Sequence, residues 1–143
     1  MNSTNPKKIL VVEDDSSLNM LLVGHLEKLG YEVTGVATGK EARALLEGAT
    51  PDLILLDIRL PDCSGLDLLV EFSPRAPVIT MTAYGAVDQA VKAVRTGASD
   101  YLVKPVSYEA MELAIERAFE TAELKRDVAY WQQQARRIVH SAV

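Results

Sequence analysis

The sequence predicts a single α/β domain with a doubly wound, five-stranded parallel sheet and five helices, the last of them extended. The first observation is that short apolar runs alternate with segments of helical periodicity along the 143 residues. This alternation is typical of parallel strands joined by right-handed crossovers. The second is the run at residues 53–56, where four consecutive large apolar residues indicate a strand buried on both faces.

The composition limits the class of protein. With 48% apolar and 24% charged residues, the chain has the make-up of an ordinary globular domain. Its net charge of −5 argues against a nucleic-acid surface, and no apolar run approaches the roughly 20 residues of a membrane helix. Residues 1–8 lack a secretory core, and the single cysteine, Cys63, fits a reducing compartment. We therefore expect a cytoplasmic protein without direct contact with nucleic acid or membrane.

Four elements are expected in the first part of the chain: a strand at 9–12, a helix at 16–29, a weaker strand at 31–36 and a helix at 40–47. Ser16 and Ser17 are suitable caps for the first helix, and Gly30 ends it. Its inward face is expected to comprise Leu18, Leu21, Leu22, His25, Leu26 and Leu29. On that face His25 should be a packed side chain and not a ligand.

The second part adds strands at 53–57, 78–81 and 101–103, helices at 66–72 and 86–95, and a long final helix. The apolar spacing of helix 66–72 is carried by Leu66, Leu69 and Val70. The helix at 86–95 is expected to face inward through Val87, Ala90, Val91 and Val94. The final helix should do so through Met111, Ala114, Ile115, Ala118, Phe119 and Ala122.

Polar residues follow four of the five strands directly. They are Glu13 and Asp14, Asp57, Thr82, and Lys104. Because the carboxyl ends of parallel strands share one edge of a sheet, these side chains should lie near one another. Open α/β sheets bind their ligands at that edge, so the sequence predicts a site centred on Asp57.

Four short motifs at these strand ends resemble one family. They are Val-Glu-Asp-Asp at 12–15, Leu-Leu-Asp at 55–57, Met-Thr-Ala at 81–83 and Tyr-Leu-Val-Lys-Pro at 101–105. Together they resemble the receiver domain of two-component response regulators, and the likeness covers residues 8–119. The resemblance implies a flavodoxin-like fold, with the receiver domain at residues 7–122 and a helical linker at 123–143.

The resemblance also implies the roles of the site residues. Asp57 would accept a phosphoryl group from a sensor histidine kinase. Asp14 would bind Mg²⁺ directly and Glu13 through a water, with Asp57 and the backbone carbonyl of Arg59 completing the protein ligands. Which two of the three acids after the first strand form the pocket is open from the residues alone. We choose Glu13 and Asp14 because Val12 is the last apolar residue of the strand.

Three further positions complete the implied switch. Thr82 would hydrogen-bond the phosphoryl oxygens, Lys104 would pair with them, and Tyr101 would turn inward when Thr82 moves. The physics agrees, because adjacent carboxylates repel unless a cation offsets them and Mg²⁺ prefers oxygen ligands. Arg59 and Tyr84 would flank the phosphoryl group, and we hypothesise that they hinder the hydrolytic water and prolong the life of the phosphoprotein.

The end of the final helix has its own pattern. Beyond Ala122 the apolar positions change face and repeat at heptad spacing: Leu124, Val128, Trp131, Ala135 and Ile138. This seam predicts a homodimer through the C-terminal helix. The arrangement resembles the receivers of sigma-54-dependent transcriptional activators, which implies a downstream output domain beyond this fragment.

Three other functions can be weighed against this signalling role. A stand-alone phosphorelay intermediate would have little use for a heptad helix. A phosphohydrolase with an aspartyl-phosphate intermediate would want an acid two residues after the nucleophile, where this chain has Arg59. A nucleotide-binding protein of the same fold would want a phosphate-cradling loop after the first strand, and three acids there would repel phosphate. We therefore expect a phosphoacceptor signalling domain and not an enzyme.

Overall fold

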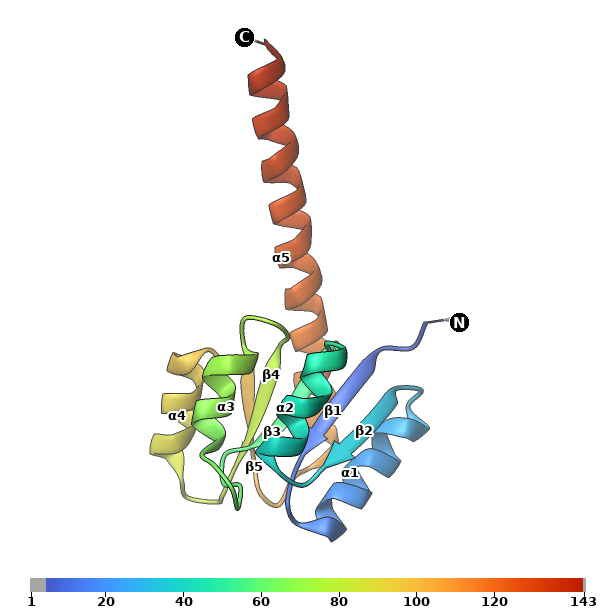
Figure 1. Cartoon of the computed structure of the whole chain (residues 1–143), viewed down its shortest axis with the longest axis vertical. Coiled ribbons are helices and arrows are strands. Elements are labelled where there is room, and N and C mark those ends of the chain that lie inside the picture. The colour runs from blue at the N-terminus through green and yellow to red at the C-terminus, as the bar shows by residue number, and fades with distance from the viewer. Residues whose placement is uncertain (1–4, 143) are drawn as a thin grey trace.

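The computed structural model describes residues 5–142, with side chains described as far as residue 137. Five strands alternate with five helices along the chain (Figure 1). The strands are β1 (Lys8–Val12), β2 (Glu32–Val36), β3 (Leu53–Asp57), β4 (Val78–Thr82) and β5 (Asp100–Val103). The helices are α1 (Ser16–Lys28), α2 (Gly39–Gly48), α3 (Gly65–Phe72), α4 (Val87–Thr96) and α5 (Tyr108–Ala142). The predicted fold class is confirmed.

The strands form one parallel sheet in the order β2-β1-β3-β4-β5. β1 and β3 are therefore adjacent, and the chain reverses its direction of winding between them. In open sheets of this kind, ligands bind beside the strands where the order reverses. The topology thus directs attention to the carboxyl ends of β1 and β3.

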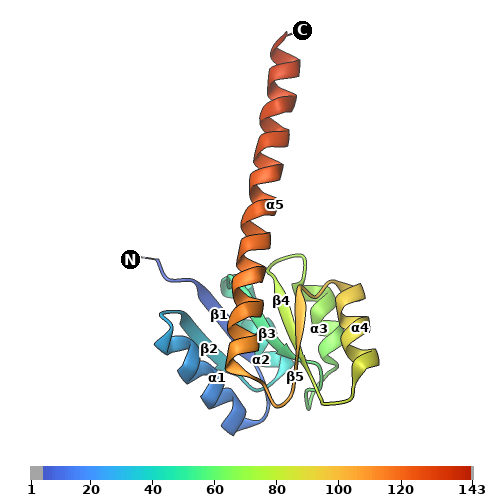
Figure 2. The ribbon, with the colours of Figure 1, turned by 180° about the vertical axis from the view of Figure 1, so that it is seen from behind.

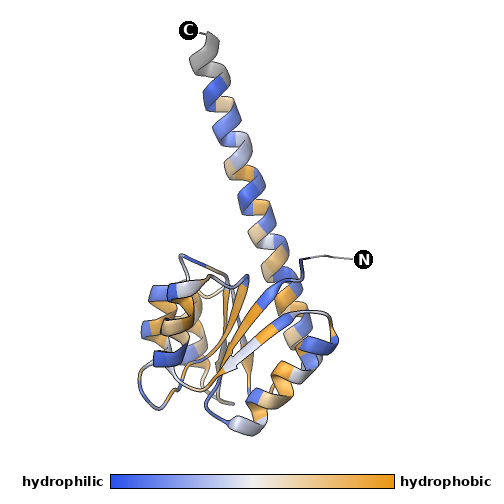
Figure 3. Ribbon diagram, turned by 45° about the vertical axis from the view of Figure 1, so that its right-hand side comes forward, coloured by the Kyte–Doolittle hydropathy of each residue, from blue (hydrophilic) through white to orange (hydrophobic). Residues whose placement is uncertain are grey.

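Helices cover both faces of the sheet, α1 and α5 on one and α2, α3 and α4 on the other (Figure 1 and Figure 2). Every residue of β3 is buried, as the apolar run predicts. Alternate residues belong to different cores: Ile54 and Leu56 pack toward α2 and α3, and Leu53 and Leu55 toward α1 and α5. Orange colouring accordingly dominates the central strands of the sheet (Figure 3). Packing on both faces therefore fixes the position of β3 and of Asp57, its last residue.

Helix α1 differs from the expectation in its cap and its inward face. Asp15, not Ser16 or Ser17, caps it, because the Asp15 carboxylate accepts the backbone N–H of Leu18 at 3.1 Å. Leu22 and Leu26 are fully buried, but Leu21 and Leu29 are exposed. The face that α1 turns to the sheet is therefore narrower than predicted. His25 is packed, as predicted, since its ring stacks on Tyr108 with centroids 3.9 Å apart.

The predicted inward faces of α4 and α3 are partly wrong. In α4, Val87, Val91 and Val94 are 68%, 45% and 47% exposed, whereas Ala90 and Ala93 are buried. Alanine side chains allow a helix to approach its neighbours closely, and α4 uses this small face against α3 and the sheet. Val70 of α3 is likewise exposed, and Leu68, Leu69 and Phe72 are the buried residues.

Helix α5 has two distinct halves. Its first turns are buried through Met111, Ala114, Ile115 and Ala118, as predicted. The helix then continues without a break to Ala142 and projects from the domain (Figure 1). Leu124, Val128 and Trp131 are 64%, 49% and 67% exposed, Ala135 is exposed, and the side chain of Ile138 lies outside the described residues. No helix in the described part of the chain is both long and apolar enough to span a membrane.

Candidate functional site

Three carboxylates meet at the carboxyl ends of β1 and β3. Asp57 is the last residue of β3, and Glu13 and Asp14 directly follow β1. One oxygen from each of the three carboxylates lies within 4.8 Å of the others. Glu13 and Asp57 are only 1% and 4% exposed, whereas Asp14 is exposed. The adjacency of β1 and β3 in the sheet therefore brings together residues that are 44 positions apart in the chain.

Lys104 supplies the positive charge of this cluster. It directly follows β5, and its backbone N–H donates to the carbonyl of Thr82 at 2.8 Å. Its Nζ lies 2.9 Å from Asp57 Oδ2 and 2.6 Å from Glu13 Oε1. One ammonium group thus contacts two buried carboxylates, which would otherwise repel each other.

Burial and charge shift the pKa of two of these groups. Burial raises the pKa of Glu13 to about 7, against the opposing effect of the Lys104 ammonium and the Asp15 N–H. Burial alone would lower the pKa of Lys104, but contacts with Glu13 and Asp57 outweigh it and raise that pKa. Near neutral pH Lys104 remains charged while Glu13 is poised to gain or lose a proton.

The loop after β3 fixes the Asp57 carboxylate. The backbone N–H of Arg59 donates to Asp57 Oδ1 at 3.0 Å, so each carboxylate oxygen has a partner. The loop closes when the Gly65 N–H donates to the Ile58 carbonyl at 2.7 Å. A Cβ at Gly65 would overlap the Asp57 carbonyl and approach Ile58 Cα to 2.5 Å. This position therefore has to be glycine for the loop to return so closely beneath Asp57.

Thr82 and Tyr101 lie on neighbouring strands next to the cluster. Thr82 is buried at the end of β4, and its hydroxyl donates to the carbonyl of Leu102 at 3.4 Å. Tyr101, on the edge strand β5, is 43% exposed. In this structure the Thr82 hydroxyl is thus bonded toward β5 and the Tyr101 ring is on the surface.

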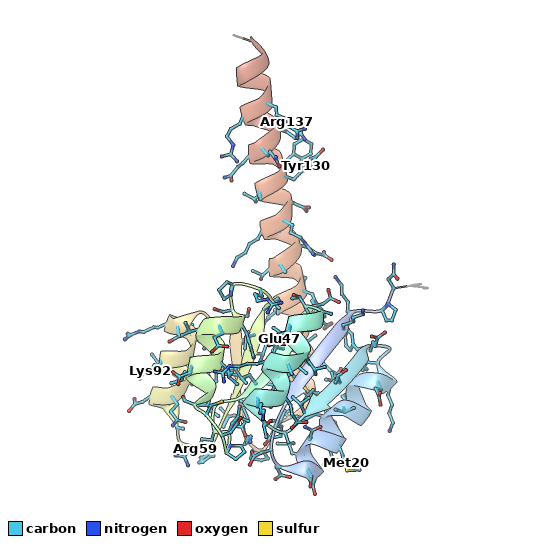
Figure 4. The ribbon with its side chains drawn as sticks, in the orientation of Figure 1. Met20, Glu47, Arg59, Lys92, Tyr130 and Arg137 are labelled. Carbon is cyan, nitrogen blue, oxygen red and sulfur yellow. The ribbon has the colours of Figure 1, made fainter. Side chains whose placement is uncertain are left out.

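A cleft of about 340 Å³ opens over the three acids, and Glu13, Asp14, Asp57, Arg59, Thr82 and Lys104 all line it. Arg59 lies at the end of the domain opposite the projecting helix (Figure 4). Gln89 of α4 also lines the cleft, and sequence reasoning missed it because nothing marks a lone glutamine on a helix. Within the described chain, Tyr84 and Tyr101 are outside this lining, and Tyr84 is 86% exposed.

The donor set fits a hard divalent cation. Glu13 Oε1 is buried and, within the described residues, makes no hydrogen bond of good geometry; its contact with Lys104 is a close ion pair. It therefore keeps capacity to accept. Carboxylate oxygens gathered around an open cleft are the ligands that Mg²⁺ prefers. Asp15 is engaged elsewhere, because its carboxylate caps α1.

The arrangement combines a fixed, buried carboxylate with a lysine and an acidic cation site. These groups suit the capture of a phosphoryl group on a carboxylate, where positive charge must surround the transferred oxygens. A buried aspartate therefore faces a lysine at the switch point of a doubly wound parallel sheet, which places the chain in the class of α/β domains whose site lies at the carboxyl ends of the strands.

Comparison with known proteins gives the family. The model of the response regulator receiver domain matches residues 9–116. The chain is 41% identical over 122 residues to the regulatory protein LuxO of Vibrio cholerae, covering 82% of this chain and 27% of LuxO. It is 37% identical over 142 residues to the alginate biosynthesis transcriptional regulatory protein AlgB of Pseudomonas aeruginosa, covering 96% and 32%.

Solved structures agree. The crystal structure of NtrX from Brucella abortus superimposes with a TM-score of 0.83 at 35% identity, covering 89% of this chain and 30% of NtrX. The chain therefore belongs to the response regulator receiver family, and it is most like the receivers of sigma-54-dependent transcriptional activators. It spans less than a third of the length of the relatives named here.

Proposed function

We propose that this chain is the phosphoacceptor of a two-component system, in which a sensor histidine kinase phosphorylates Asp57 in the cytoplasm. The observation that carries the proposal is the Asp57 carboxylate at the end of the central strand, 2.9 Å from Lys104 and beside the acids of β1. A carboxylate held this rigidly is a competent nucleophile once its surrounding charge is balanced.

The proposed transfer is a displacement at phosphorus. An Asp57 carboxylate oxygen attacks the phosphorus of a phosphohistidine, the P–N bond breaks, and the imidazole leaves with the electron pair. Lys104 offsets the charge of the phosphoryl oxygens, as cationic groups do in other phosphoryl transfers. Glu13, Asp14, Asp57 and the Arg59 carbonyl would hold Mg²⁺, which when bound would neutralise the charge between the acids and the phosphate.

Phosphorylation would act through Thr82 and Tyr101. The Thr82 hydroxyl, now bonded to Leu102, would turn to the phosphoryl oxygens, and the Tyr101 ring would move inward. The exposed position of Tyr101 and the exposed valines of α4 support this idea, because both leave room for the α4–β5–α5 surface to rearrange. A phosphate shifts such an equilibrium only by binding one of the two states better.

The output of the switch would be transcriptional and would lie in a domain beyond this fragment. The relatives LuxO and AlgB, by their names, are regulatory proteins, and each is more than three times as long as the part matched here. We place the division between the receiver domain and the helical linker at residues 122–123, and the exposure of every residue of α5 from 123 to 130 supports this choice. The exposed Leu124, Val128 and Trp131 would pair with the same helix of a second subunit.

The decisive experiment uses a small phosphodonor with Mg²⁺ and intact-mass detection. The wild-type chain should gain the mass of one phosphoryl group, and Asp57→Asn should not. Chelation of Mg²⁺ should prevent the gain. A phosphoryl group that still appears on Asp57→Asn would contradict the assignment of the acceptor.

Two narrower measurements test the other parts. Sedimentation of the chain, intact and truncated after Ala122, should show a dimer only for the intact chain. Arg59→Ala and Tyr84→Ala should each lose phosphate faster than wild type if these side chains hinder the hydrolytic water. Tyr84→Ala should have the smaller effect, because the Tyr84 side chain is 86% exposed. An unchanged lifetime for both variants would remove that role.

A further inference from the structure

Asn19, a residue outside the cleft, makes two hydrogen bonds that converge on Glu13. It lies in the second turn of α1, and its Nδ2 donates to the carbonyl of Glu13 at 2.9 Å and to the carbonyl of Val36 at 3.0 Å. The Val36 carbonyl also accepts the Glu13 N–H at 3.0 Å. The peptide groups on both sides of the Glu13 Cα are therefore tied to the end of β2 by one closed set of bonds.

The neighbouring strand leaves space for this side chain. A Cβ at Gly35 would overlap Asn19 Oδ1 and approach Val23 Cγ2 to 2.9 Å. Glycine within a strand weakens it, and here it marks the close approach of another group. The absence of a side chain at position 35 thus has a specific use: it admits the Asn19 amide to the carbonyls at the ends of β1 and β2.

The constraint matters because Glu13 occupies an unfavourable place. Its carboxylate is buried beside Asp57, and one of its oxygens makes no well-formed hydrogen bond within the described chain. Lys104 offsets the repulsion between the two carboxylates, but the desolvation of Glu13 still favours rotation of its side chain toward solvent. A backbone that cannot turn at Glu13 limits that escape and keeps the carboxylate in the cleft.

We propose that Asn19 is a positioning residue for the acidic cleft: its amide fixes the Glu13 backbone, and Gly35 makes room for it. The inference rests on the proposed function, since it concerns the residues that would hold Mg²⁺. Outer groups that orient metal ligands commonly contribute about 10-fold or more to metal affinity. Asn19 should therefore affect cation binding more than it affects the chemistry at Asp57.

The test measures Mg²⁺ binding to the full chain by calorimetry without a phosphodonor. Asn19→Ala should bind Mg²⁺ about 10-fold more weakly than wild type. At saturating Mg²⁺, the rate of phosphorylation by a small phosphodonor should return close to that of wild type. Met20→Ala is the matched control, because Met20 is the next residue of the same helix and is 74% exposed; it should bind Mg²⁺ as wild type does.

A second variant displaces Asn19 without changing it. Gly35→Ala should push the amide away and weaken Mg²⁺ binding to a similar degree. Asn19→Ala removes the amide that the new methyl group would overlap and leaves only the end of the Val23 side chain to shift, so the double variant should bind little more weakly than Asn19→Ala alone. If the losses of Mg²⁺ affinity in the two single variants add up in the double variant, Gly35 does not act through Asn19 and this part of the proposal is wrong.

The possible failures are distinguishable. If wild type binds Mg²⁺ and folded Asn19→Ala binds it equally well, the positioning role is wrong and the proposed function stands. A fall in thermal stability with unchanged Mg²⁺ affinity leads to the same conclusion. If wild type itself binds no Mg²⁺, the proposed function fails at its metal site. Should Asn19→Ala not fold, Asn19→Ser and Gly35→Ala provide the same comparison.

Discussion

The two sides of the Asp57 cleft are built differently. On one side, Asp62 of the loop after β3 accepts the backbone N–H groups of Gly39 and Lys40 at the start of α2, both at 3.0 Å. Arg43 of α2 forms a bidentate ion pair with Glu71 of α3. Loop, α2 and α3 are therefore fastened to one another by polar contacts as well as by their shared core.

On the other side, α4 and β5 are fastened weakly. Within residues 5–142 no side chain caps the start of α4, which Ala86 precedes. The helix packs through two alanines, while Val87, Val91 and Val94 remain exposed. β5 is the edge strand and exposes Tyr101 and Val103. Elements with few buried contacts and free ends open at lower cost than the rest of a domain.

This contrast between the two sides indicates which elements can move in response to a change at the cleft. A phosphoryl group on Asp57 would lie between a firmly bonded side, made of α2, α3 and the loop after β3, and a weakly fastened side, made of α4 and β5. Small shifts at the cleft should therefore be taken up by α4 and β5. Five predictions test this contrast, beginning with the largest expected effect.

The first prediction concerns Gly65→Ala, at the point where the start of α3 lies closest to the backbone of β3 and the loop after it. The added methyl group would press on the backbone of Asp57 and Ile58, which cannot move aside as a flexible side chain can. We expect a loss of about 2–3 kcal/mol in the free energy of unfolding, as for overpacked cores, together with impaired phosphorylation. Urea denaturation measures the loss. Gly48→Ala, where nothing lies within 4 Å of the new Cβ, should be nearly neutral.

The second prediction concerns Glu13, which lies in the cleft between the two sides. Because its pKa is raised to about 7 from 4.5, the folded chain binds a proton more tightly than the unfolded chain does. The contribution of Glu13 to the stability of the metal-free protein should therefore be fully present below pH 4.5 and be lost as the pH rises through 7. Glu13→Gln should remove this loss and raise metal-free stability at pH 8 by about 1 kcal/mol. Thermal unfolding between pH 5 and pH 8 in chelator checks it.

Mg²⁺ should reverse the effect of pH at Glu13. Binding requires the ionised carboxylate, so the affinity for Mg²⁺ should rise with pH up to about 7, by at most about 10-fold per pH unit. Calorimetry at several pH values measures this slope. An affinity independent of pH would contradict the participation of Glu13 in the cation site.

Asp62→Asn should weaken only the contact between the loop after β3 and the start of α2. The two N–H groups of α2 lower the pKa of Asp62, so its contribution is present above the usual value of 3.8 and is lost as the pH falls below it. We expect the melting temperature to fall by about 2–4 °C at pH 7, since one helix cap is weakened. The melting curves of variant and wild type should converge on acidification; a constant difference would assign the effect to packing.

Val91→Ser tests the weakly fastened side at α4 and should have the smallest effect on stability. The side chain is 45% exposed, so its replacement should change the free energy of unfolding by no more than about 0.5 kcal/mol. Leu69→Ala on α3, which is fully buried, should cost about 2–5 kcal/mol by contrast. A large loss for Val91→Ser would mean that α4 is packed as firmly as α3 and would break the comparison.

Much of the fold and of the site could be predicted from the chain alone. Apolar runs such as residues 53–56 identify strands, because a strand of a parallel sheet is covered on both faces and all of its side chains are then buried. The polar residues that follow them had to share one edge once the sheet was parallel. The structure places Glu13, Asp14, Asp57, Thr82 and Lys104 around a single cleft, as that reasoning anticipated.

Other features depend on groups distant in sequence. Local spacing placed Ala90 on the inward face of α4 correctly, but it could not show that Ala93 is buried while the valines are exposed, because valine is the more apolar residue and only the closeness of α3 favours the smaller one. Nor could it show that Asp15 caps α1, since Ser16 and Ser17 are equally good caps by residue type. Gln89, Asn19 and Asp62 owe their positions to contacts between elements and carry no signal of their own.

The order of the elements, the parallel sheet and the edge at which the acids gather follow from the amino-acid sequence alone, because burial and backbone geometry act over a few neighbouring residues. The tertiary structure alone decided which face of each helix is covered and which polar groups brace the cleft. These contacts join residues far apart in the chain, such as Asn19 with Val36 and Asp62 with Gly39, and they exist only once the sheet has brought the loops together.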